Sequence, residues 1–428
     1  MKLELCKIVI DKLEWGAQTS AQNGVLTVNK EELAARILED KALKSVEIEL
    51  VHPGDKTRIL PVKDAVQPRY KLEGPGQVFP GWIGDVETVG SGKTLVLEGA
   101  AVLTTGRLVA PQEGIVDMSG PGAPYTPFSK TCNIVLVFEP QDGIELHELE
   151  AVYRMAGLRA AFYLAEACRE CKIDKTETYD WPPLKDSMKA YPDLPKVAYV
   201  YMLQSQGLLH DTWVYGVDAK RILPTMISPT ETMDGAIISG NCVSACDKNS
   251  TYIHENNPVI KSLFEHHGKD INFVGVIITN ENVTLKDKKR SSFYAIKLAS
   301  MLGVDGVVIS EEGFGNPDAD LIMNCWKAER AGIRTVLITD EYAGRDGGSQ
   351  SLADSCPEGD ACVTAGNANE VIILPPMEKV IGDPAKADVI AGGFFGSLRD
   401  DGSMEVELQA ILGATCELGY NLIGARTL

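Results

Sequence analysis

A cysteine that directly follows an asparagine is the most reactive feature of the segment Ser-Gly-Asn-Cys-Val-Ser-Ala-Cys-Asp-Lys, residues 239–248. The thiol of Cys242 can attack the carbonyl carbon of Asn241 and convert that peptide bond to a thioester. A flexible Gly240 and a strained turn would help this shift. Elimination of the thioester would leave dehydroalanine, which tautomerises and hydrolyses to a pyruvoyl group. The pair therefore suits self-cleavage, although an Asn-Cys dipeptide also occurs by chance beside a buried structural cysteine.

Several side chains close to this bond in the chain could assist it. Lys248 and His254 could bind a substrate carboxylate or transfer a proton. Cys246 fits a structural role, or a role in processing, better than metal binding, because zinc and iron–sulfur sites need more ligands. We therefore expect no metal here. The possible supporting residues are Gly240, Ser244, Cys246, Asp247, Lys248 and His254.

Two other motifs are incomplete. Cys168 and Cys171 form a C-x-x-C pair, but it closes a predicted long helix, whereas redox pairs usually open one. A structural role is the first interpretation of this pair and a redox role the second. The run Gly-Ser-Gly-Lys-Thr at 90–94 lacks the first glycine of a phosphate loop, because Glu87 stands at that position. We therefore expect no nucleotide site.

The elements that must position the reactive segment are clearest in the last third of the chain. One helix is predicted from Ser291 to Gly303, and another is predicted to start at Asn316-Pro317, with proline at its first position. Strand–helix–strand alternation implies right-handed crossovers and a doubly wound parallel sheet. The predicted strands cover residues 271–279, 304–310, 333–339 and 371–374.

Ligands of such sheets bind beyond the carboxyl ends of the strands. The sequence places four polar side chains there, and a long loop at 340–369 adds an arginine that could clamp a carboxylate through two hydrogen bonds. Ordinary solvated loop acids are the alternative interpretation. The candidate pocket residues are Asn280, Glu311, Glu312, Asp340 and Arg345.

The rest of the chain divides by pattern. Residues 1–105 carry short alternating runs, which predict a β-rich domain with one early helix capped by Asn29. Residues 106–241 predict a mixed α/β region with a long helix at 146–171. Residues 242–428 hold the doubly wound domain. The fold class is therefore α/β in three parts, and cleavage before Cys242 would make residues 1–241 one polypeptide and residues 242–428 another.

Composition excludes some classes of protein. The formal net charge is −19, which argues against nucleic-acid binding, because phosphate backbones need a basic surface. No run has the length of a signal peptide or of a membrane span, so we expect a cytoplasmic protein. In that compartment the ten cysteines are expected to stay as thiols.

A longer string around the reactive bond carries a resemblance. Residues 240–252 read Gly-Asn-Cys-Val-Ser-Ala-Cys-Asp-Lys-Asn-Ser-Thr-Tyr, the chain opens with Met-Lys-Leu-Glu-Leu, and residues 25–33 read Val-Leu-Thr-Val-Asn-Lys-Glu-Glu-Leu. Over its whole length the chain resembles the precursor of the alpha and beta pyruvoyl subunits of glycine, sarcosine and betaine reductase component B. The proline reductase precursor shares the pyruvoyl strategy but is a longer chain.

This resemblance implies a mechanism. Cleavage between Asn241 and Cys242 would yield a beta chain of residues 1–241 and an alpha chain of residues 242–428, with a covalent pyruvoyl group from Cys242. Its ketone would bind the substrate amine as a Schiff base for reductive deamination. The family's overall reaction forms acetyl phosphate and ammonia or an amine with a thioredoxin-type reductant. Glycine is the first candidate substrate and sarcosine the second, because betaine has no N–H with which to condense.

The resemblance also implies partners. These are the selenoprotein gamma subunit of component B, the component A selenoprotein and component C, with component B as a heterohexamer of two alpha, two beta and two gamma subunits. Two other interpretations remain open. One is a self-processing hydrolase that keeps Cys242 as an N-terminal nucleophile. The other is an uncut α/β binding module.

Overall fold

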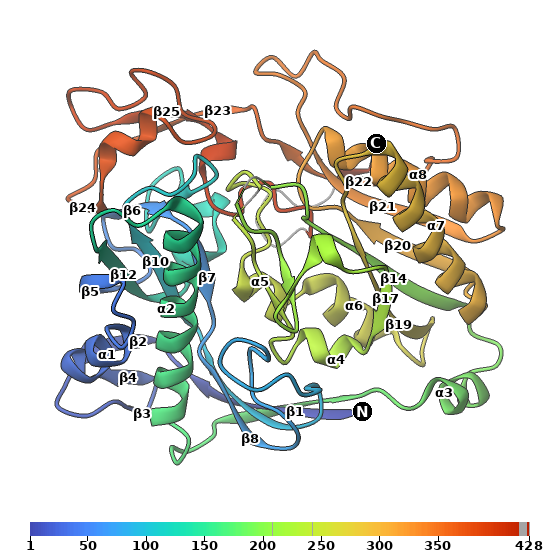
Figure 1. Cartoon of the computed structure of the whole chain (residues 1–428), viewed down its shortest axis with the longest axis horizontal. Coiled ribbons are helices and arrows are strands. Elements are labelled where there is room, and N and C mark those ends of the chain that lie inside the picture. Colours follow the sequence, from blue (N-terminus) through green and yellow to red (C-terminus); the bar gives the residue numbers. More distant parts are fainter. Residues whose placement is uncertain (208, 242, 419–425, 428) are drawn as a thin grey trace.

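The structure of the chain is a computed structural model that describes residues 1–207, 209–241, 243–418 and 426–427. Sheets built mainly from the first 140 residues lie on one side of the molecule, and a seven-stranded sheet with its helices lies on the other (Figure 1). The segment around the predicted cleavage site runs between the two sides.

The described strands before the predicted cleavage site are β1 (Lys2–Val9), β2 (Lys12–Trp15), β3 (Ser20–Gln22), β4 (Val25–Val28), β5 (Leu43–Val51), β6 (Thr57–Val62), β7 (Asp64–Val66), β8 (Arg69–Glu73), β9 (Gly92–Glu98), β10 (Ala100–Gly106), β11 (Gly114–Asp117), β12 (Cys132–Pro140), β13 (Lys175–Asp180), β14 (Lys196–Leu203), β15 (Trp213–Val214), β16 (Val217–Asp218), β17 (Thr225–Ile227) and β18 (Ile237–Ile238). The later strands are β19 (Asn272–Asn280), β20 (Gly306–Ser310), β21 (Arg334–Glu341), β22 (Cys362–Asn367), β23 (Val371–Leu374), β24 (Lys379–Gly382), β25 (Met404–Glu407) and β26 (Arg426–Thr427).

The described α-helices are α1 (Lys30–Ile37), α2 (Leu146–Ala167), α3 (Leu184–Ala190), α4 (Pro229–Thr232), α5 (Thr251–Glu255), α6 (Pro258–His266), α7 (Leu285–Leu302) and α8 (Asn316–Arg330). Short 3-10 turns are η1 (Ala123–Tyr125), η2 (Pro127–Lys130), η3 (Ala219–Arg221), η4 (Pro384–Asp388) and η5 (Leu408–Ala410). The mixed α/β class predicted from the sequence is confirmed.

The seven-stranded sheet has the order β17-β19-β14-β20-β21-β22-β26 among the described residues. The strands β14, β19, β20, β21 and β22 are parallel, and β17 and β26 are antiparallel edges. In chain order the five parallel strands lie second, first, third, fourth and fifth, which is a doubly wound arrangement. Its topological switch point falls between β14 and β20.

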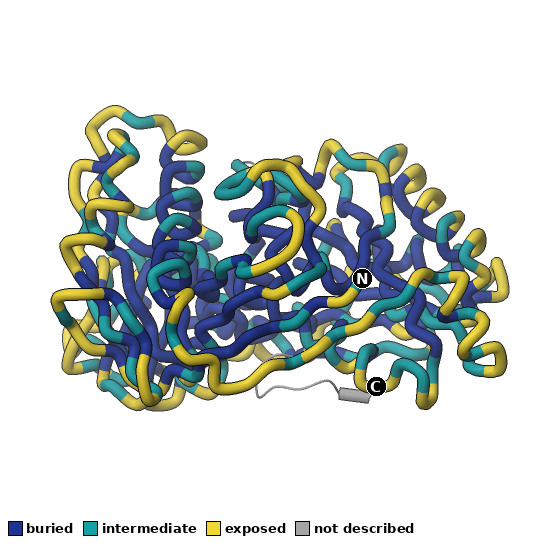
Figure 2. Tube along the Cα trace, turned by 90° about the horizontal axis from the view of Figure 1, so that it is seen from below, coloured by how far each residue is buried: buried dark blue, intermediate teal, exposed yellow. Residues whose placement is uncertain are grey.

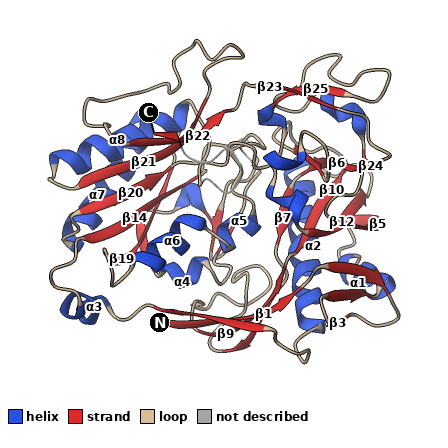
Figure 3. Ribbon diagram, turned by 180° about the vertical axis from the view of Figure 1, so that it is seen from behind, coloured by secondary structure: helices blue, strands red, loops and turns tan. Residues whose placement is uncertain are grey.

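Helices cover both faces of this sheet. On one face, side chains of α7 and α8 such as Ile296 and Leu321 pack with Val200 of β14. On the other, Ile260 of α6 packs with Tyr201 of β14. Every residue of β19 is buried, as its continuous apolar run predicted. Figure 3 shows α7 and α8 on the outer side of the sheet.

The sheet takes strands from both sides of the predicted cleavage site. Its central strand β14 belongs to residues 1–241 and pairs with β19 and β20, which belong to residues 242–428. The N-terminal sheets likewise extend beyond residue 105, because β10 pairs with β12 and β6 pairs with β24. Hydrogen bonds thus join the three predicted parts of the chain. The boundaries between these parts, after residues 105 and 241, remain predictions.

The sheet to which one predicted strand belongs and the start of one predicted helix were wrong. The fourth strand, Val371–Leu374, forms as β23 but pairs with β25 in a separate two-stranded antiparallel sheet, and β22 takes its place beside β21. Helix α7 starts six residues before Ser291, because Thr284 accepts a hydrogen bond from the backbone N–H of Asp287 as the cap. The end at Gly303 is confirmed, and α8 begins at Asn316, so Pro317 is its second residue and not its first.

Burial follows this architecture. Buried residues run through the middle of the chain trace, and exposed residues lie mostly in peripheral loops and outer helix faces (Figure 2). Within the described residues, none of the helices combines the length and apolar character that crossing a membrane requires.

Candidate processing and substrate site

The segment around the predicted cleavage site lies at the switch point of the sheet. Val243 and Ser244 line a hollow of about 210 Å³ together with residues that follow β14 and β20. These residues include Gln204, beyond the carboxyl end of β14, and Gly313, beyond that of β20. Ligand sites of open α/β sheets occur at this position. The sheet therefore brings the residues after the bond to its ordinary ligand-binding edge.

Two of the three residues before the bond, Ser239 and Asn241, are held by hydrogen bonds to three other segments of the chain. The backbone N–H of Ser239 donates to Oγ1 of Thr251 at 3.1 Å, and its carbonyl accepts from Nε of Arg154 at 3.4 Å. The backbone N–H of Asn241 donates to the carbonyl of His210 at 3.1 Å. Such fixation lowers the entropic cost of bringing reacting atoms together.

Lys248 is a buried cation at this segment. Its Nζ donates to Oδ1 of Asn241 at 2.8 Å and to the carbonyl of Lys63 at 3.1 Å. Both Lys248 and Asn241 are buried. Nδ2 of Asn241 is buried and has no hydrogen-bond partner among the described residues. A positive charge thus lies beside the residue whose carbonyl would take up negative charge if a nucleophile added to it.

Gly240 is required by close backbone packing. A Cβ at this position would lie 2.3 Å from the carbonyl carbon of Asp211 and 2.6 Å from the amide nitrogen of Thr212. These are main-chain atoms that cannot turn away as a flexible side chain can. Only glycine therefore lets the segment pass this closely beside residues 211–212.

A small cavity of about 20 Å³ adjoins the same segment, and this volume suits one or two water molecules. It combines carboxylates and cations that sequence reasoning missed. In its wall, Glu150 accepts from Nη1 of Arg154 at 3.0 Å and also pairs with Nδ1 of His210. Asp64 accepts from the hydroxyl of Thr251 at 2.7 Å. The cavity lining is Lys63, Asp64, Thr104, Glu150, Tyr153, Arg154, Ser239, Gly240 and Asn241.

Several buried carboxyl groups lie near residues 247–249 or contact one another, and we call this set the acidic cluster. Asn249 ties two members together, because its backbone N–H donates to Oε1 of Glu312 at 3.0 Å and its Nδ2 donates to Oε1 of Glu417 at 2.6 Å. The backbone N–H of Glu312 donates to Oε1 of Glu281 at 2.8 Å. The acidic cluster consists of Asp247, Glu281, Glu311, Glu312, Asp340 and Glu417, all buried.

Burial keeps protons on this cluster. It raises the pKa of Glu312 to about 7 and raises the pKa values of Glu281, Glu311 and Glu417 well above the usual range of glutamate. Glu312 therefore exchanges its proton near neutral pH. A group with such a pKa is suited to general acid–base work.

Asp247 and Asp340 form a hydrogen-bonded carboxyl pair. Burial raises the pKa of both, and the two carboxyls share a hydrogen bond. Sγ of Cys246 donates to Oδ1 of Asp247 at 2.6 Å, and the hydroxyl of Thr415 donates to Asp340 at 2.8 Å. Ligand atoms of Cys246, Asp247 and Asp340 lie within 4.8 Å of one another, so their spacing would permit a cation. Their internal hydrogen bonds already occupy these atoms.

His254 lies on α5 in a neutral environment. Its Nδ1 is hydrogen-bonded to the hydroxyl of Tyr201 at 2.7 Å, and burial lowers its pKa to about 3. Nε2 of His254 is buried without a hydrogen-bond partner among the described residues. An imidazole in this state is uncharged at neutral pH, so it suits hydrogen bonding better than carboxylate binding.

The structure brings most of the predicted site residues together. Lys248 contacts Asn241, Asp247 pairs with Asp340, and Glu312 accepts the backbone N–H of Asn249, the residue after Lys248. Ser244 is half-buried in the switch-point hollow. Cys242, the predicted pyruvoyl precursor, lies outside the described residues.

Two predicted pocket residues take other roles. Nδ2 of Asn280 donates to the carbonyls of Ala219 and Ile222, each at 3.0 Å, and thereby ties β19 to the preceding loop. Arg345 is exposed, and its Nε donates to Glu407 at 2.7 Å in the long loop region.

The C-x-x-C pair lies elsewhere, at the end of α2. Cys168 is the C-terminal cap of this helix and is fully buried, and Cys171 is half-buried. Burial raises the pKa of Cys168 far above its ordinary value. A thiol in this state is a poor nucleophile, which favours the structural interpretation. All cysteines that the structure describes are free thiols.

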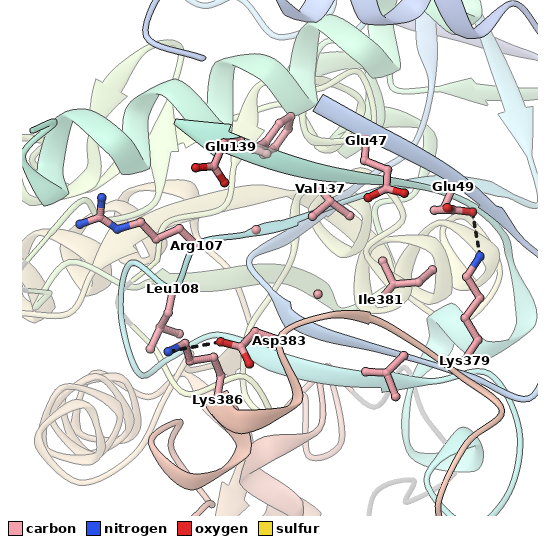
Figure 4. A pocket seen from close by; sticks show the side chains of 14 residues that line it. Glu47, Glu49, Arg107, Leu108, Val137, Glu139, Lys379, Ile381, Asp383 and Lys386 are labelled. Atoms are coloured by element: carbon pink, nitrogen blue, oxygen red, sulfur yellow. Dashed lines mark hydrogen bonds and ion pairs between the residues drawn. The ribbon is translucent and has the colours of Figure 1, made fainter. Parts of the chain in front are cut away.

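A larger hollow of about 530 Å³ lies apart from these residues, between β5, β12 and β24. Acidic and basic side chains in its wall form ion pairs with each other. Lys379 pairs with Glu49 at 2.8 Å, and Lys386 pairs with Asp383 at 3.4 Å, as Figure 4 shows. It contains none of the residues that flank the predicted cleavage site.

Comparison with known proteins defines the class. A family model described as glycine/sarcosine/betaine reductase component B subunits matches residues 1–426. The chain therefore belongs to this family, and its role is that of an oxidoreductase component. No solved structure shows a significant match to it.

Named relatives cover the full chain. It is 62% identical to the glycine reductase complex component B subunits alpha and beta of Acetoanaerobium sticklandii over all of both chains. It is 53% identical to the sarcosine reductase complex component B subunit alpha of Peptoclostridium acidaminophilum, again over all of both chains. It is 38% identical to the betaine reductase complex component B subunit alpha of the same organism, over 98% of each chain.

Proposed function

We propose that the chain is the precursor of two subunits of an amino-acid reductase, with glycine as the first candidate substrate and sarcosine or betaine as the others. It cleaves itself between Asn241 and Cys242, and residue 242 becomes a pyruvoyl group. Such a carbonyl supplies an electrophile that binds the substrate amine and weakens its C–N bond. The identities of 62%, 53% and 38% to the glycine, sarcosine and betaine components support this order of substrates.

The observation that carries the proposal is the constrained segment before the bond. Gly240 passes against a neighbouring backbone, both backbone polar groups of Ser239 are bound, and Lys248 reaches Asn241. An ordinary surface loop has no need for a buried lysine and for a glycine with no space for a Cβ. Self-cleavage needs both restraint and charge stabilisation at this carbonyl.

The residues divide the work of cleavage. Lys248 stabilises negative charge that develops on Asn241 during thiol attack. Glu312, whose pKa is about 7, serves as the proton reservoir beside the segment, since its carboxyl accepts the backbone N–H of the adjoining Asn249. The hydrogen bond that the backbone N–H of Asn241 donates to the carbonyl of His210 keeps Asn241 in place before and after the bond breaks.

Substrate would bind in the switch-point hollow. Its volume of about 210 Å³ is below the 300–1,000 Å³ of ordinary drug-sized sites, and this suits an amino acid better than a nucleotide. Val243 and Ser244 in its wall directly follow the residue that would carry the carbonyl. A small substrate in this hollow therefore has access to the proposed electrophile.

The proposal includes partners, because this chain carries no selenolate. They are the selenoprotein gamma subunit of component B, the component A selenoprotein and component C, with two alpha, two beta and two gamma subunits in component B. The cytoplasm is the compartment that fits these partners and the free thiols.

Trapping of labelled substrate tests the proposal. Natively purified protein is incubated with radiolabelled glycine, and borohydride is added to fix any bound amine. The proposal predicts one label on the 187-residue fragment (428 − 241) and none on the 241-residue fragment. Pretreatment with borohydride before glycine is the control and should abolish labelling. Labelling that survives this pretreatment, or that falls on the larger fragment, would contradict the proposal.

A further inference from the structure

Helix α7 exposes an unusual number of large apolar side chains. Leu285 is 56% exposed, Phe293 57% and Met301 74%, and Val283 just before the helix is 65% exposed. The inward residues of the same helix, such as Ala295 and Ile296, are buried against the sheet. These apolar side chains are spread along the helix, and non-obligate interfaces likewise set apolar contacts among polar ones.

The charge of this helix is opposite to that of the whole chain. Residues 283–302 contain five basic residues and a single acidic one, whereas the chain contains 41 basic and 60 acidic residues. Lys286, Lys289, Arg290 and Lys297 are exposed, and the one acid, Asp287, pairs with Arg290. A cationic surface on a protein with net charge −19 is available to steer an acidic partner.

The first turn of α7 is joined to the wall of the switch-point hollow. Nζ of Lys288 donates to the carbonyl of Asn316 at 2.6 Å, which joins the first turn of α7 to the first turn of α8. Asn316 lines the hollow, together with Phe314, which is 39% exposed. The start of α7, which carries the exposed Lys286, therefore lies beside the start of α8, whose residue Asn316 lines the hollow.

We propose that the α7 docking face, defined by Lys286, Lys289, Arg290, Phe293 and Lys297, binds an acidic protein that exchanges during turnover and delivers the attacking nucleophile to the switch-point hollow. This inference rests on the proposed function, because only a chain that lacks its own reductant needs such a delivery. The inference specifies which surface of the chain binds the partner, and that charge attraction and apolar contacts hold the complex together.

Charge decides among the occupants. A second copy of the chain docked face to face would bring lysines against lysines, which is unfavourable in a symmetric interface. A permanently bound subunit would call for a continuous apolar patch, because obligate interfaces are large and hydrophobic. Cations interleaved with single apolar side chains suit a transient, electrostatically steered complex.

The test is association of the natively purified component B with purified component A selenoprotein, measured by titration calorimetry at low and at moderate salt. The variant reverses three charges, Lys286→Glu, Lys289→Glu and Arg290→Glu. The control reverses three exposed cations elsewhere, Lys172→Glu, Lys185→Glu and Lys189→Glu, with the same change in net charge. We expect Kd to rise about tenfold or more in the first variant only, and the wild-type affinity to fall with salt.

Equal affinities of the two variants, salt-independent binding or absence of binding by the wild type would overturn the docking proposal. A thermal melt of each variant shows that these surface changes leave the fold intact. Docking does not require the pyruvoyl ketone. Wild type in which borohydride has reduced this ketone should therefore bind equally well. If natively purified protein proved to carry no pyruvoyl group and the first variant still lost binding, the docking face would be sustained and the pyruvoyl proposal rejected.

Discussion

Nζ of Lys248 donates a 2.8 Å hydrogen bond to Oδ1 of Asn241, and both side chains are buried. A lysine in such a place costs desolvation energy, and the fold retains it seven residues from the residue that it binds. The same ammonium also reaches the carbonyl of Lys63, between β6 and β7. The contact therefore joins the segment at the predicted cleavage site to the N-terminal sheets.

Replacing Lys248 with methionine should slow cleavage about 100-fold or more, because the developing negative charge on Asn241 loses the cation that binds this residue. The measurement is the rate at which purified precursor gives the 187-residue fragment on a denaturing gel. The exposed Lys189→Met variant is the control and should cleave at the wild-type rate. Unchanged cleavage of a folded Lys248→Met precursor would remove this lysine from the mechanism.

Gly240→Ala should abolish cleavage and destabilise the fold by about 1–3 kcal/mol, because the added Cβ meets main-chain atoms of residues 211–212. Gly306→Ala is the matched control, because a Cβ there would meet its nearest atom, the carbonyl oxygen of Arg334, at 3.4 Å. Urea denaturation and fragment yield are measured on both. Full processing of Gly240→Ala would show that the close approach is not needed.

Stability should fall as the pH rises through neutrality, and Glu312 should account for part of the fall. Burial raises its pKa from the ordinary 4.5 to about 7, so the folded chain holds this proton more tightly than the unfolded chain. The stabilisation is complete below the unfolded pKa and is lost as the pH rises through about 7. Its size is on the order of 3 kcal/mol.

Glu312→Gln tests this assignment, because glutamine keeps the shape of the neutral acid and cannot ionise. The urea midpoint of the wild type should drop more between pH 5 and pH 8 than that of the variant. Parallel pH profiles of the two proteins would show that Glu312 does not titrate in this range.

The two fragments should stay together after cleavage. Strand β14 of the first fragment is hydrogen-bonded on both sides to strands of the second, β19 and β20. Separating the fragments would expose this buried sheet to water. The free-energy cost of that exposure should hold the fragments together without the peptide bond. Size-exclusion chromatography without denaturant should give one peak that contains both fragments, and two separate peaks would be inconsistent with this sheet.

Local features of the sequence predicted much of the fold. Asn29 caps α1 through a 3.0 Å hydrogen bond from the backbone N–H of Glu32, and Asn316-Pro317 opens α8. Cap chemistry and apolar runs act over a few residues, so they can be seen in one segment. The pairing of β23 with β25 could not be seen, because it depends on which distant strand offers a free edge.

The site residues, too, comprise some that the sequence predicted and others that only the tertiary fold brings together. Asn241, Lys248 and Asp247 are close in sequence, and the strand-end rule pointed to Glu312 and Asp340. Glu150, Arg154 and His210 were missed, because helix α2 and the 209–212 segment reach the bond only through the tertiary fold. Arg345 was placed by its loop alone, and its ion pair with Glu407 is a long-range contact.

Intact mass spectrometry of the protein purified from its native host tests the central claim most directly. The account predicts fragments of 241 and 187 residues (428 − 241), with the smaller one lighter than its encoded mass and two hydrogens heavier after borohydride. A 187-residue fragment at its encoded mass with a free N-terminal thiol would contradict the pyruvoyl group. A single uncut chain from that host would contradict cleavage itself.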